Sequence, residues 1–225
     1  MSPRNLAVFD VDGTLIDSQD LIHDAMERAF AETGHPCPPR AEVLAIVGLS
    51  LPEAMAVLAP HLPEATRDDL TRHYREGFVS QRANTTEALA PLYPGARDAL
   101  DRLSTRPDAM MGIATGKARP GLDHLFKTHP IGHFFITTQT ADAHPSKPHP
   151  SMLLRALAET GCAADRAVMI GDTEFDMAMG KAAGYATIGV TWGYHPRARL
   201  EAAGADVLID GYDALDAALA RLWDA

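Results

Sequence analysis

The sequence has few features of a secreted or membrane-bound protein. It contains two cysteines in 225 residues, and Cys37 and Cys162 form no C-x-x-C pair. We therefore expect two reduced thiols and no disulfide framework. No apolar run approaches the roughly 18 residues that suggest a membrane span. Residues 1–5 show no signal-peptide pattern either, which leads us to expect a cytoplasmic protein without a membrane partner.

Positive charge is also scarce. The chain has 20 Lys and Arg against 30 Asp and Glu, and its formal net charge is -10. This excess disfavours nucleic acid as a partner, so an anionic substrate must be attracted by local positive groups. Hydrophobic residues make up 46% and charged residues 22% of the chain, which is ordinary for a globular protein and excludes the disordered and fibrous classes. The length allows one substantial core plus a small accessory unit.

Two carboxylates follow the first apolar segment. Residues 6–9 are uniformly apolar, which predicts a short strand buried on both faces of a parallel sheet. Asp10 then stands at the edge where open α/β sheets bind ligands, and Gly13 allows a sharp turn that directs Asp10 and Asp12 into one cleft. Neighbouring carboxylates repel, which raises one pKa or attracts a hard cation such as Mg²⁺. The same stretch also suits a plain strand-to-turn junction, so both interpretations remain open here.

The next part of the chain has helical patterns and no convincing strand. Apolar residues at i, i+3 and i+4 predict a first helix that Asp17 or Ser18 can cap and Gly34 ends. A turn at residues 48–52, with Pro52 at the first helical position, precedes a later helix. The expected helices cover residues 18–34, 41–47, 51–59 and 63–82.

Beyond Pro91, short apolar strands alternate with helices. The expected strands are 109–114, 134–138, 167–170, 186–190 and 206–209, and the expected helices are 94–103, a segment from 120 onward, 149–160 and 174–183. This alternation predicts an α/β fold with a doubly wound parallel sheet. We expect residues 1–16 and 88–225 to form the core, and residues 17–87 to form an all-helical insert that acts as a lid beside the reactive edge.

Polar residues stand at or just after the ends of separate predicted strands. Because parallel strands end at the same edge, this topology makes such residues neighbours. Singly, each has an ordinary explanation as a strand end, a solvated loop lysine or a helix cap. Together, in this order, they favour a common site made of Asp10 with Asp12, Thr115 with Gly116, Lys147, and Asp172 with Asp176.

These motifs resemble those of the haloacid dehalogenase superfamily, in its phosphatase branch with a helical cap. The matching pieces are Asp10-x-Asp12-Gly13-Thr14, Thr115-Gly116, Lys147-Pro148 and Gly171-Asp172-Thr173-x-x-Asp176. The resemblance implies a nucleophile at Asp10 and an acid and base at Asp12. It implies that the transferring phosphoryl group is held by Thr115, Gly116 and Lys147. It also implies a Mg²⁺ cofactor bound by Asp10, the Asp12 backbone carbonyl and Asp172, with Asp176 positioning the metal shell.

The choice of reaction rests on finer resemblances. Halide displacement has no alkoxide for Asp12 to protonate. Sugar phosphomutases usually have Glu-Asp where this chain has Gly171-Asp172, and commonly Arg where it has Leu51, so hydrolysis is favoured. Residues 189–195 are similar to a stretch of phosphoglycolate phosphatases, and residues 48–51 resemble the cap turn of that group and of related pyrophosphatases. We therefore expect Mg²⁺-dependent hydrolysis of a small phosphomonoester, with 2-phosphoglycolate as the leading candidate.

Other functions remain open at this point. A sugar phosphomutase or a pyrophosphatase of the same superfamily is one alternative, and a non-catalytic phospholigand sensor, which has no need of Asp12, is another. Arg82 and Arg119 are candidates for contacting a substrate carboxylate, although each is ordinary as a solvated surface charge. A histidine metal site is a further possibility, but no H-E-x-x-H or Cys/His pattern is formed by His129, His133, His144, His149 and His195.

Overall fold

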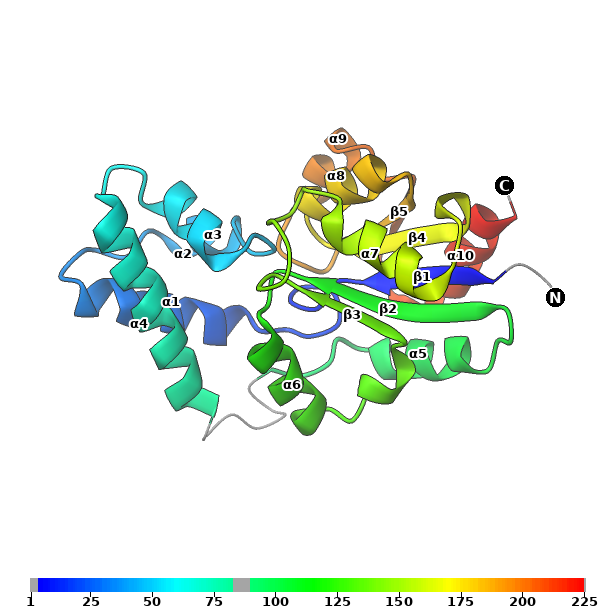
Figure 1. Cartoon of the computed structure of the whole chain (residues 1–225), viewed down its shortest axis with the longest axis horizontal. Helices are drawn as coiled ribbons and strands as arrows, with labels where there is room; N and C mark the ends of the chain where they lie inside the picture. The colour runs from blue at the N-terminus through cyan, green and yellow to red at the C-terminus, as the bar shows by residue number, and fades with distance from the viewer. Residues whose placement is uncertain (1–3, 83–89, 225) are drawn as a thin grey trace.

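A six-stranded parallel sheet forms the centre of the molecule. The computed structural model describes residues 4–82 and 90–224, and Figure 1 shows the sheet covered by helices and flanked by a separate helical group. The strand order is β3-β2-β1-β4-β5-β6, and all five neighbouring pairs are parallel. The strands are β1 Asn5–Phe9, β2 Ala109–Thr115, β3 Thr137–Thr140, β4 Ala167–Gly171, β5 Ala186–Val190 and β6 Val207–Ile209.

Both faces of this sheet are covered, so its central strands are apolar on both sides. Helices α5 and α10 pack on one face, and α7 and α8 pack on the other. The core helices are α5 Ala96–Ser104, α6 Arg119–Thr128, α7 Ser151–Thr160, α8 Glu174–Ala183, α9 Arg197–Ala202 and α10 Leu215–Trp223. This arrangement confirms the predicted doubly wound α/β fold.

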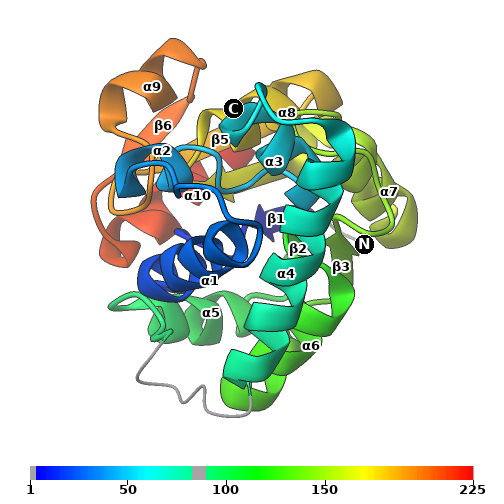
Figure 2. The same ribbon diagram turned by 90° about the vertical axis from the view of Figure 1, so that its left-hand side faces the viewer.

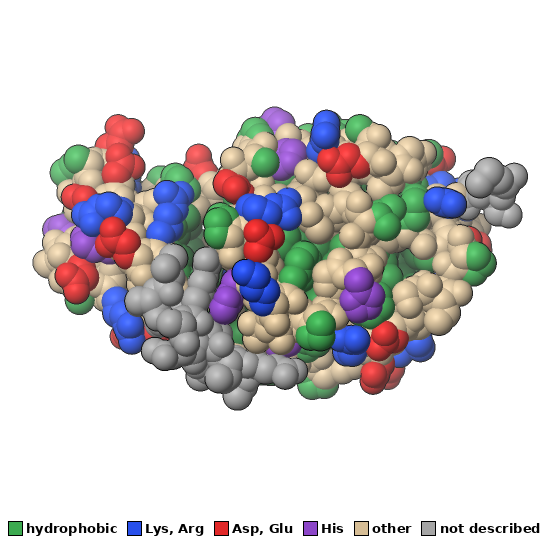
Figure 3. Space-filling view, turned by 60° about the horizontal axis from the view of Figure 1, so that its bottom comes forward, with side chains coloured by type: hydrophobic (Ala, Val, Ile, Leu, Met, Phe, Trp, Pro, Cys, Tyr) green, Lys and Arg blue, Asp and Glu red, His purple; other side chains and the backbone are tan. Residues whose placement is uncertain are grey.

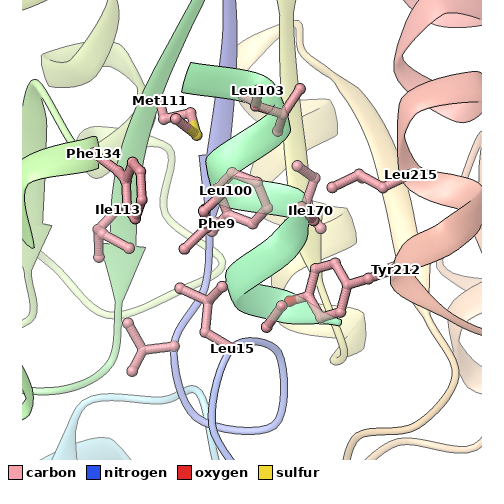
Figure 4. Close-up of a cluster of buried hydrophobic side chains, with 14 of the residues drawn as sticks. Phe9, Leu15, Leu100, Leu103, Met111, Ile113, Phe134, Ile170, Tyr212 and Leu215 are labelled. Atoms are coloured by element: carbon pink, nitrogen blue, oxygen red, sulfur yellow. The ribbon is translucent and has the colours of Figure 1, made fainter. Parts of the chain in front are cut away.

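Strand β1 contributes to the core on both of its faces. Leu6 and Val8 pack on the side of α7, whereas Ala7 and Phe9 point into the larger cluster on the side of α5. Figure 4 shows this larger cluster, to which both Phe9 and Leu100 belong. The alternation explains why residues 6–9 of β1 are all apolar, and it fixes the direction in which the chain leaves the strand at Asp10.

Four helices form a second group beyond the carboxyl ends of the strands (Figures 1 and 2). They have a small apolar core of their own, which includes Met26, Phe30, Met55 and Leu70. The helices are α1 Gln19–Glu32, α2 Arg40–Leu44, α3 Leu51–Leu58 and α4 Glu64–Arg82. These helices are the all-helical cap predicted from the sequence, and the expected boundary between residues 87 and 88 lies outside the described residues.

The strand expected at residues 134–138 is shifted in the structure. Residues Gly132–Phe134 form a 3-10 helix, and β3 begins only at Thr137. The prediction was wrong because it followed the apolar residues, whereas this edge strand is polar. Hydrogen bonds satisfy its buried side chains: the Thr137 hydroxyl and the Gln139 amide donate to Glu159 at 2.6 and 2.8 Å.

The packing of α5 against β1 leads to a test of stability. Leu100 is fully buried in the cluster of Figure 4. We expect Leu100→Ala to lower the free energy of unfolding by about 2–5 kcal/mol, because it leaves a cavity among side chains that cannot fully collapse. Urea denaturation measures this change. In the control Leu154→Ala, the side chain on α7 is 49% exposed, and a loss as large as that of Leu100→Ala would contradict this account of the core.

Candidate active site

Carboxylates from three separate segments meet at the carboxyl edge of the sheet. Asp10 follows β1, Asp172 follows β4, and Asp176 lies in the first turn of α8. Each offers an oxygen, and these oxygens all lie within 4.8 Å of one another in a fully buried position. The ammonium of Lys147, from the loop before α7, lies 3.0 Å from Asp10 Oδ1 and 2.6 Å from Asp176 Oδ1. We call these four residues the acidic cluster.

Close backbone packing fixes Asp172 in this cluster. A Cβ atom at Gly13 would lie 2.1 Å from Asp172 Oδ2, and one at Gly193 would lie 2.2 Å from Asp172 Cβ. The loop after β1 and the loop after β5 therefore enclose the carboxylate only because both positions are glycine. Two donors orient it: the Thr14 hydroxyl donates to Oδ1 at 2.9 Å, and the Tyr194 backbone N–H donates to Oδ2 at 2.8 Å.

Helix α8 fixes Asp176 through its own N-terminus. The Thr173 backbone N–H donates to Asp176 Oδ2 at 3.0 Å and the Asp176 backbone N–H donates to the Thr173 hydroxyl at 3.3 Å, which together form a capping box. The Thr173 hydroxyl also lies 2.7 Å from Asp176 Oδ2. The other oxygen, Oδ1, accepts a hydrogen bond from Lys147. The residue that caps α8 is thus Thr173, while Asp172 is left to face the acidic cluster.

The acidic cluster holds more negative than positive charge in a buried place. Burial raises the pKa of Asp10 to about 7; Lys147 opposes this shift, and Asp176 and Asp12 add to it. Burial, with Asp176 and Asp10, also raises the pKa of Asp172 well above its usual value. Burial alone would lower the pKa of Lys147. The carboxylates of Asp10 and Asp176 have the larger, opposite effect and raise its pKa above the usual value, so the ammonium stays charged. Both carboxylate oxygens of Asp10 are buried, and apart from the ion pair of Oδ1 with Lys147 they have no well-aligned donor. This arrangement suits a divalent cation with oxygen ligands.

Asp12 belongs to a second polar group beside the acidic cluster. Its Oδ1 accepts a hydrogen bond from the Ser18 hydroxyl at 2.6 Å, and its Oδ2 lies 3.0 Å from the ammonium of Lys117. Of the two predicted caps of α1, Ser18 stands at the N-cap but makes no side-chain capping bond, because its hydroxyl binds Asp12 instead. The Asp17 carboxylate accepts from the Gln19 backbone N–H at 3.3 Å. The hydroxyl of Tyr194 also contacts Ser18 and lies 2.9 Å from the Ser18 hydroxyl.

Thr115 and Gly116 lie where β2 meets the cap. The Thr115 side chain is buried, and its hydroxyl accepts a hydrogen bond from the Lys117 backbone N–H at 3.2 Å. A Cβ atom at Gly116 would lie 2.6 Å from the Gly48 carbonyl oxygen, so the cap turn packs directly on this glycine. The Ser50 backbone N–H extends the contact by donating to the Ser146 hydroxyl at 2.8 Å.

A cleft of about 840 Å³ separates the two groups of helices at this edge. Its core wall includes Asp10, Asp12, Thr115 and Lys117, and its cap wall includes residues 48–52 and the helix α4 residues Tyr74, Arg75 and Phe78. On the face drawn in Figure 3, acidic and basic side chains are intermingled. Attraction of an anion therefore depends on individual cations in the cleft, as the net charge suggests.

Comparison with known proteins shows which family this chain resembles. The profile of the haloacid dehalogenase-like hydrolases matches residues 7–190. A probable phosphatase, IndB, of Dickeya dadantii is 33% identical over 93% of this chain and 90% of its own. A phosphoglycolate phosphatase of Pseudomonas putida is 30% identical over 95% of this chain and 78% of its own. A solved haloacid dehalogenase-like hydrolase of Streptococcus pneumoniae is 27% identical, with a TM-score of 0.83 over 97% of this chain and 99% of its own.

The chain belongs to the haloacid dehalogenase-like hydrolases. With phosphatase relatives over most of its length, it is a phosphoric monoester hydrolase of that family. None of the helices within the described part of the chain is long and apolar enough to cross a membrane.

Several candidates from the sequence lie elsewhere in this hydrolase. Arg119 donates to the Thr138 hydroxyl and carbonyl at the edge of the sheet, at 2.8 and 2.6 Å, and is absent from the cleft lining. The side chain of Arg82 is outside the described residues. His195 bridges core and cap: its Nδ1 accepts from the Glu174 backbone N–H and its Nε2 lies 2.9 Å from the Ala45 carbonyl oxygen. Among described residues, none of the five histidines considered for a metal site belongs to a group that could hold an ion.

Lys117 is the cleft residue that sequence reasoning missed. Its ammonium contacts Asp12 and lies 5.2 Å from the centre of the Phe78 ring on the cap. The available signal was its place directly after Thr115-Gly116, in the loop that the topology brings to the reactive edge.

The raised pKa of Asp10 predicts how stability depends on pH without metal. Between its ordinary value of 3.8 and about 7, the folded state binds this proton more tightly than the unfolded state does, so folding becomes less favourable as pH rises. Asp10→Asn removes this dependence. We expect its free energy of unfolding, relative to wild type, to rise with pH across this window by up to about 1.4 kcal/mol per pH unit.

Urea denaturation in EDTA at several pH values measures this difference. The exposed Asp123→Asn on α6 is the matched control, and we expect its stability to follow that of wild type at every pH. Parallel profiles for Asp10→Asn and wild type would contradict the placement of Asp10 among buried like charges.

Proposed function

We propose that this hydrolase is a Mg²⁺-dependent phosphatase that transfers the phosphoryl group of a small phosphomonoester to Asp10 and then to water. The observation that carries the proposal is the acidic cluster, which places Asp10, Asp172 and Asp176 within 4.8 Å of one another next to Lys147. A buried group of this composition costs stability unless it binds a ligand, which favours a functional role.

The proposed metal ligands are Asp10, Asp172 and the Asp12 backbone carbonyl, with Asp176 positioning the metal shell. Carboxylate and carbonyl oxygens are the hard donors that Mg²⁺ prefers. When bound, Mg²⁺ would supply positive charge that neutralises the phosphoryl oxygens and keeps Asp10 ionised.

The protein side chains then have distinct proposed roles. Asp10 attacks phosphorus to form an acyl phosphate as the bond to the ester oxygen breaks, and Asp12 protonates the departing alkoxide. Asp12 next removes a proton from the water that attacks phosphorus, which releases phosphate and regenerates Asp10. Lys147, Thr115 and the backbone N–H groups near Gly116 stabilise the charge on the transferring group.

The substrate enters between core and cap. We propose that residues 17–87 act as the cap that covers the cleft, and that 2-phosphoglycolate is the leading candidate substrate. The similarity of residues 189–195 to phosphoglycolate phosphatases and the Pseudomonas putida relative support this choice.

The deciding experiment is a hydrolysis screen with 2-phosphoglycolate, sugar phosphates, nucleotides and pyrophosphate, each with Mg²⁺ and with EDTA. We expect Mg²⁺-dependent phosphate release, fastest from 2-phosphoglycolate. Preference for pyrophosphate would favour a pyrophosphatase, and isomerisation of a sugar phosphate without phosphate release would favour a phosphomutase. Tight binding of phosphorylated ligands without turnover of any would indicate a sensor.

The proposed nucleophile is tested by Asp10→Asn. We expect kcat to fall by at least about a thousandfold, because the amide cannot form the acyl phosphate. Phosphate release measures activity, and circular dichroism checks that the fold is kept. The exposed Asp123→Asn, which makes the same change of charge, should retain full activity. An Asp10→Asn variant with most of its activity would exclude this nucleophile.

The proposed acid is tested by Asp12→Ala with esters of different leaving groups. We expect a loss of about 10²–10⁴-fold for alkyl phosphates, because a poor leaving group needs the proton. For p-nitrophenyl phosphate, whose leaving group departs without a proton, the loss in the first transfer should be much smaller. A single-turnover burst experiment separates the first transfer from the second, and equal losses for all esters would argue against Asp12 as the acid.

A further inference from the structure

The position of Lys117 points to one feature of the substrate. Lys117 lies in the loop after β2, and its side chain is 12% exposed. The ammonium contacts Asp12 on the core and the ring of Phe78 on the cap. It thus lies in the cleft between the proposed acid and the cap, where the alcohol part of a phosphomonoester must pass.

The cleft offers few cations for an anionic alcohol. Among the described residues of its lining, Lys and Arg are represented by Lys117 and Arg75. Arg75 is exposed on cap helix α4, whereas Lys117 touches the proposed acid. His144 also lines the cleft, but its ring nitrogens lie 2.8 and 2.9 Å from Ser151 and Gln139 side chains. Of the two cations that line the cleft, Lys117 is therefore the one in contact with the proposed acid.

Bond geometry places a substrate carboxylate close to Lys117. In 2-phosphoglycolate, a single methylene group separates the ester oxygen from the carboxylate. An acid that protonates this ester oxygen must approach it to about 2.6–3.2 Å, and the Lys117 ammonium lies 3.0 Å from Asp12 Oδ2. A carboxylate so near the ester oxygen is within reach of Lys117 after a small side-chain rotation.

Lys117 also forms an ion pair with the proposed acid. One oxygen of Asp12 accepts from Ser18 and the other pairs with Lys117, so each oxygen already has a polar partner. A carboxylate on the substrate competes with Asp12 for the same ammonium. When Lys117 turns to the substrate, Asp12 Oδ2 becomes available for proton transfer.

We propose that Lys117 is a specificity-determining residue that pairs with a carboxylate on the alcohol part of the substrate and, in doing so, releases Asp12. This inference rests on the proposed phosphatase function and defines its substrate class as phosphomonoesters with an anionic group next to the ester carbon. Substrates without this group leave Lys117 on Asp12 and react slowly.

The test compares 2-phosphoglycolate with ethyl phosphate, which lacks the carboxylate. In wild type, we expect kcat/KM to be about 10- to 100-fold higher for 2-phosphoglycolate, the range of a hydrogen bond between charged groups. Lys117→Gln should lower kcat/KM for 2-phosphoglycolate by that factor and raise it for ethyl phosphate, because no ammonium then pairs with Asp12. Lys117→Arg should keep a large part of the preference, since it retains the charge.

Two control variants accompany the Lys117 variants. Lys127→Gln makes the same change of charge at an exposed position at the end of α6, and it should keep the wild-type preference. Arg75→Gln should also keep the preference if Lys117 binds the carboxylate. Because the result is a ratio of two substrates in each variant, a general loss of folded protein cancels.

The outcomes separate this inference from the proposed function. Equal losses of kcat/KM for both substrates in Lys117→Gln would indicate a purely structural role and overturn the inference. The proposed phosphatase function of the wild-type enzyme would still stand. Loss of the preference in Arg75→Gln instead of Lys117→Gln would overturn it as well. A wild-type enzyme that releases phosphate from no ester would refute the proposed function, and the inference with it.

Discussion

The concentration of negative charge in a buried place is the constraint on which this structure depends. Asp10, Asp172 and Asp176 are fully buried at one end of the sheet, with Lys147 as the ammonium in contact with two of them. Burial of these carboxylates and, after it, their mutual repulsion oppose their ionisation and raise the pKa values of Asp10 and Asp172. The surrounding fold must hold the carboxylates together despite this cost, and a bound cation would remove most of it.

The fold meets this constraint by its strand order. Strand β1 lies between β2 and β4, so Asp10 emerges at the point where the chain reverses its direction across the sheet, with Thr115 on one side and Asp172 on the other. This is the place where open α/β sheets bind ligands. Glycines allow the close approach of the loops around Asp172, and the apolar faces of β1 hold its end rigidly between two layers of helices.

Two polar groups with different properties result. The acidic cluster is buried and reaches the cleft through Asp10, and its side chains are fixed by backbone donors, a capping box and Lys147. The Asp12 group, with Ser18 and Lys117, lines the open cleft and reaches the cap through Phe78 and Tyr194. The first group has the composition of a metal and phosphoryl site, and the second has the cap contacts expected where the alcohol part of a substrate is bound.

Much of this arrangement could be predicted from the sequence because it follows from chain topology. The apolar run before Asp10 and the alternation of strands and helices determine which residues reach the reactive edge. The edge of the sheet was harder to predict. Strand β3 is polar, and its buried side chains are satisfied by hydrogen bonds to Glu159 of α7, a partner that no local sequence pattern reveals. Helices α9 and α10 were not anticipated, and Lys117 went unassigned, since an ion pair across two loops depends on three-dimensional packing. The hydroxyl of Ser18 was misjudged for the same reason.

The most direct test of the central claim is a crystal structure with Mn²⁺ in place of Mg²⁺, analysed by anomalous scattering. The account predicts a single strong peak in the acidic cluster, coordinated by Asp10 and Asp172, and the loss of this peak in Asp172→Asn. The other group of described residues that could hold an ion consists of His23, Asp24 and Glu27 on α1. A peak there with none between Asp10 and Asp172, or no bound ion at saturating Mn²⁺, would contradict the account.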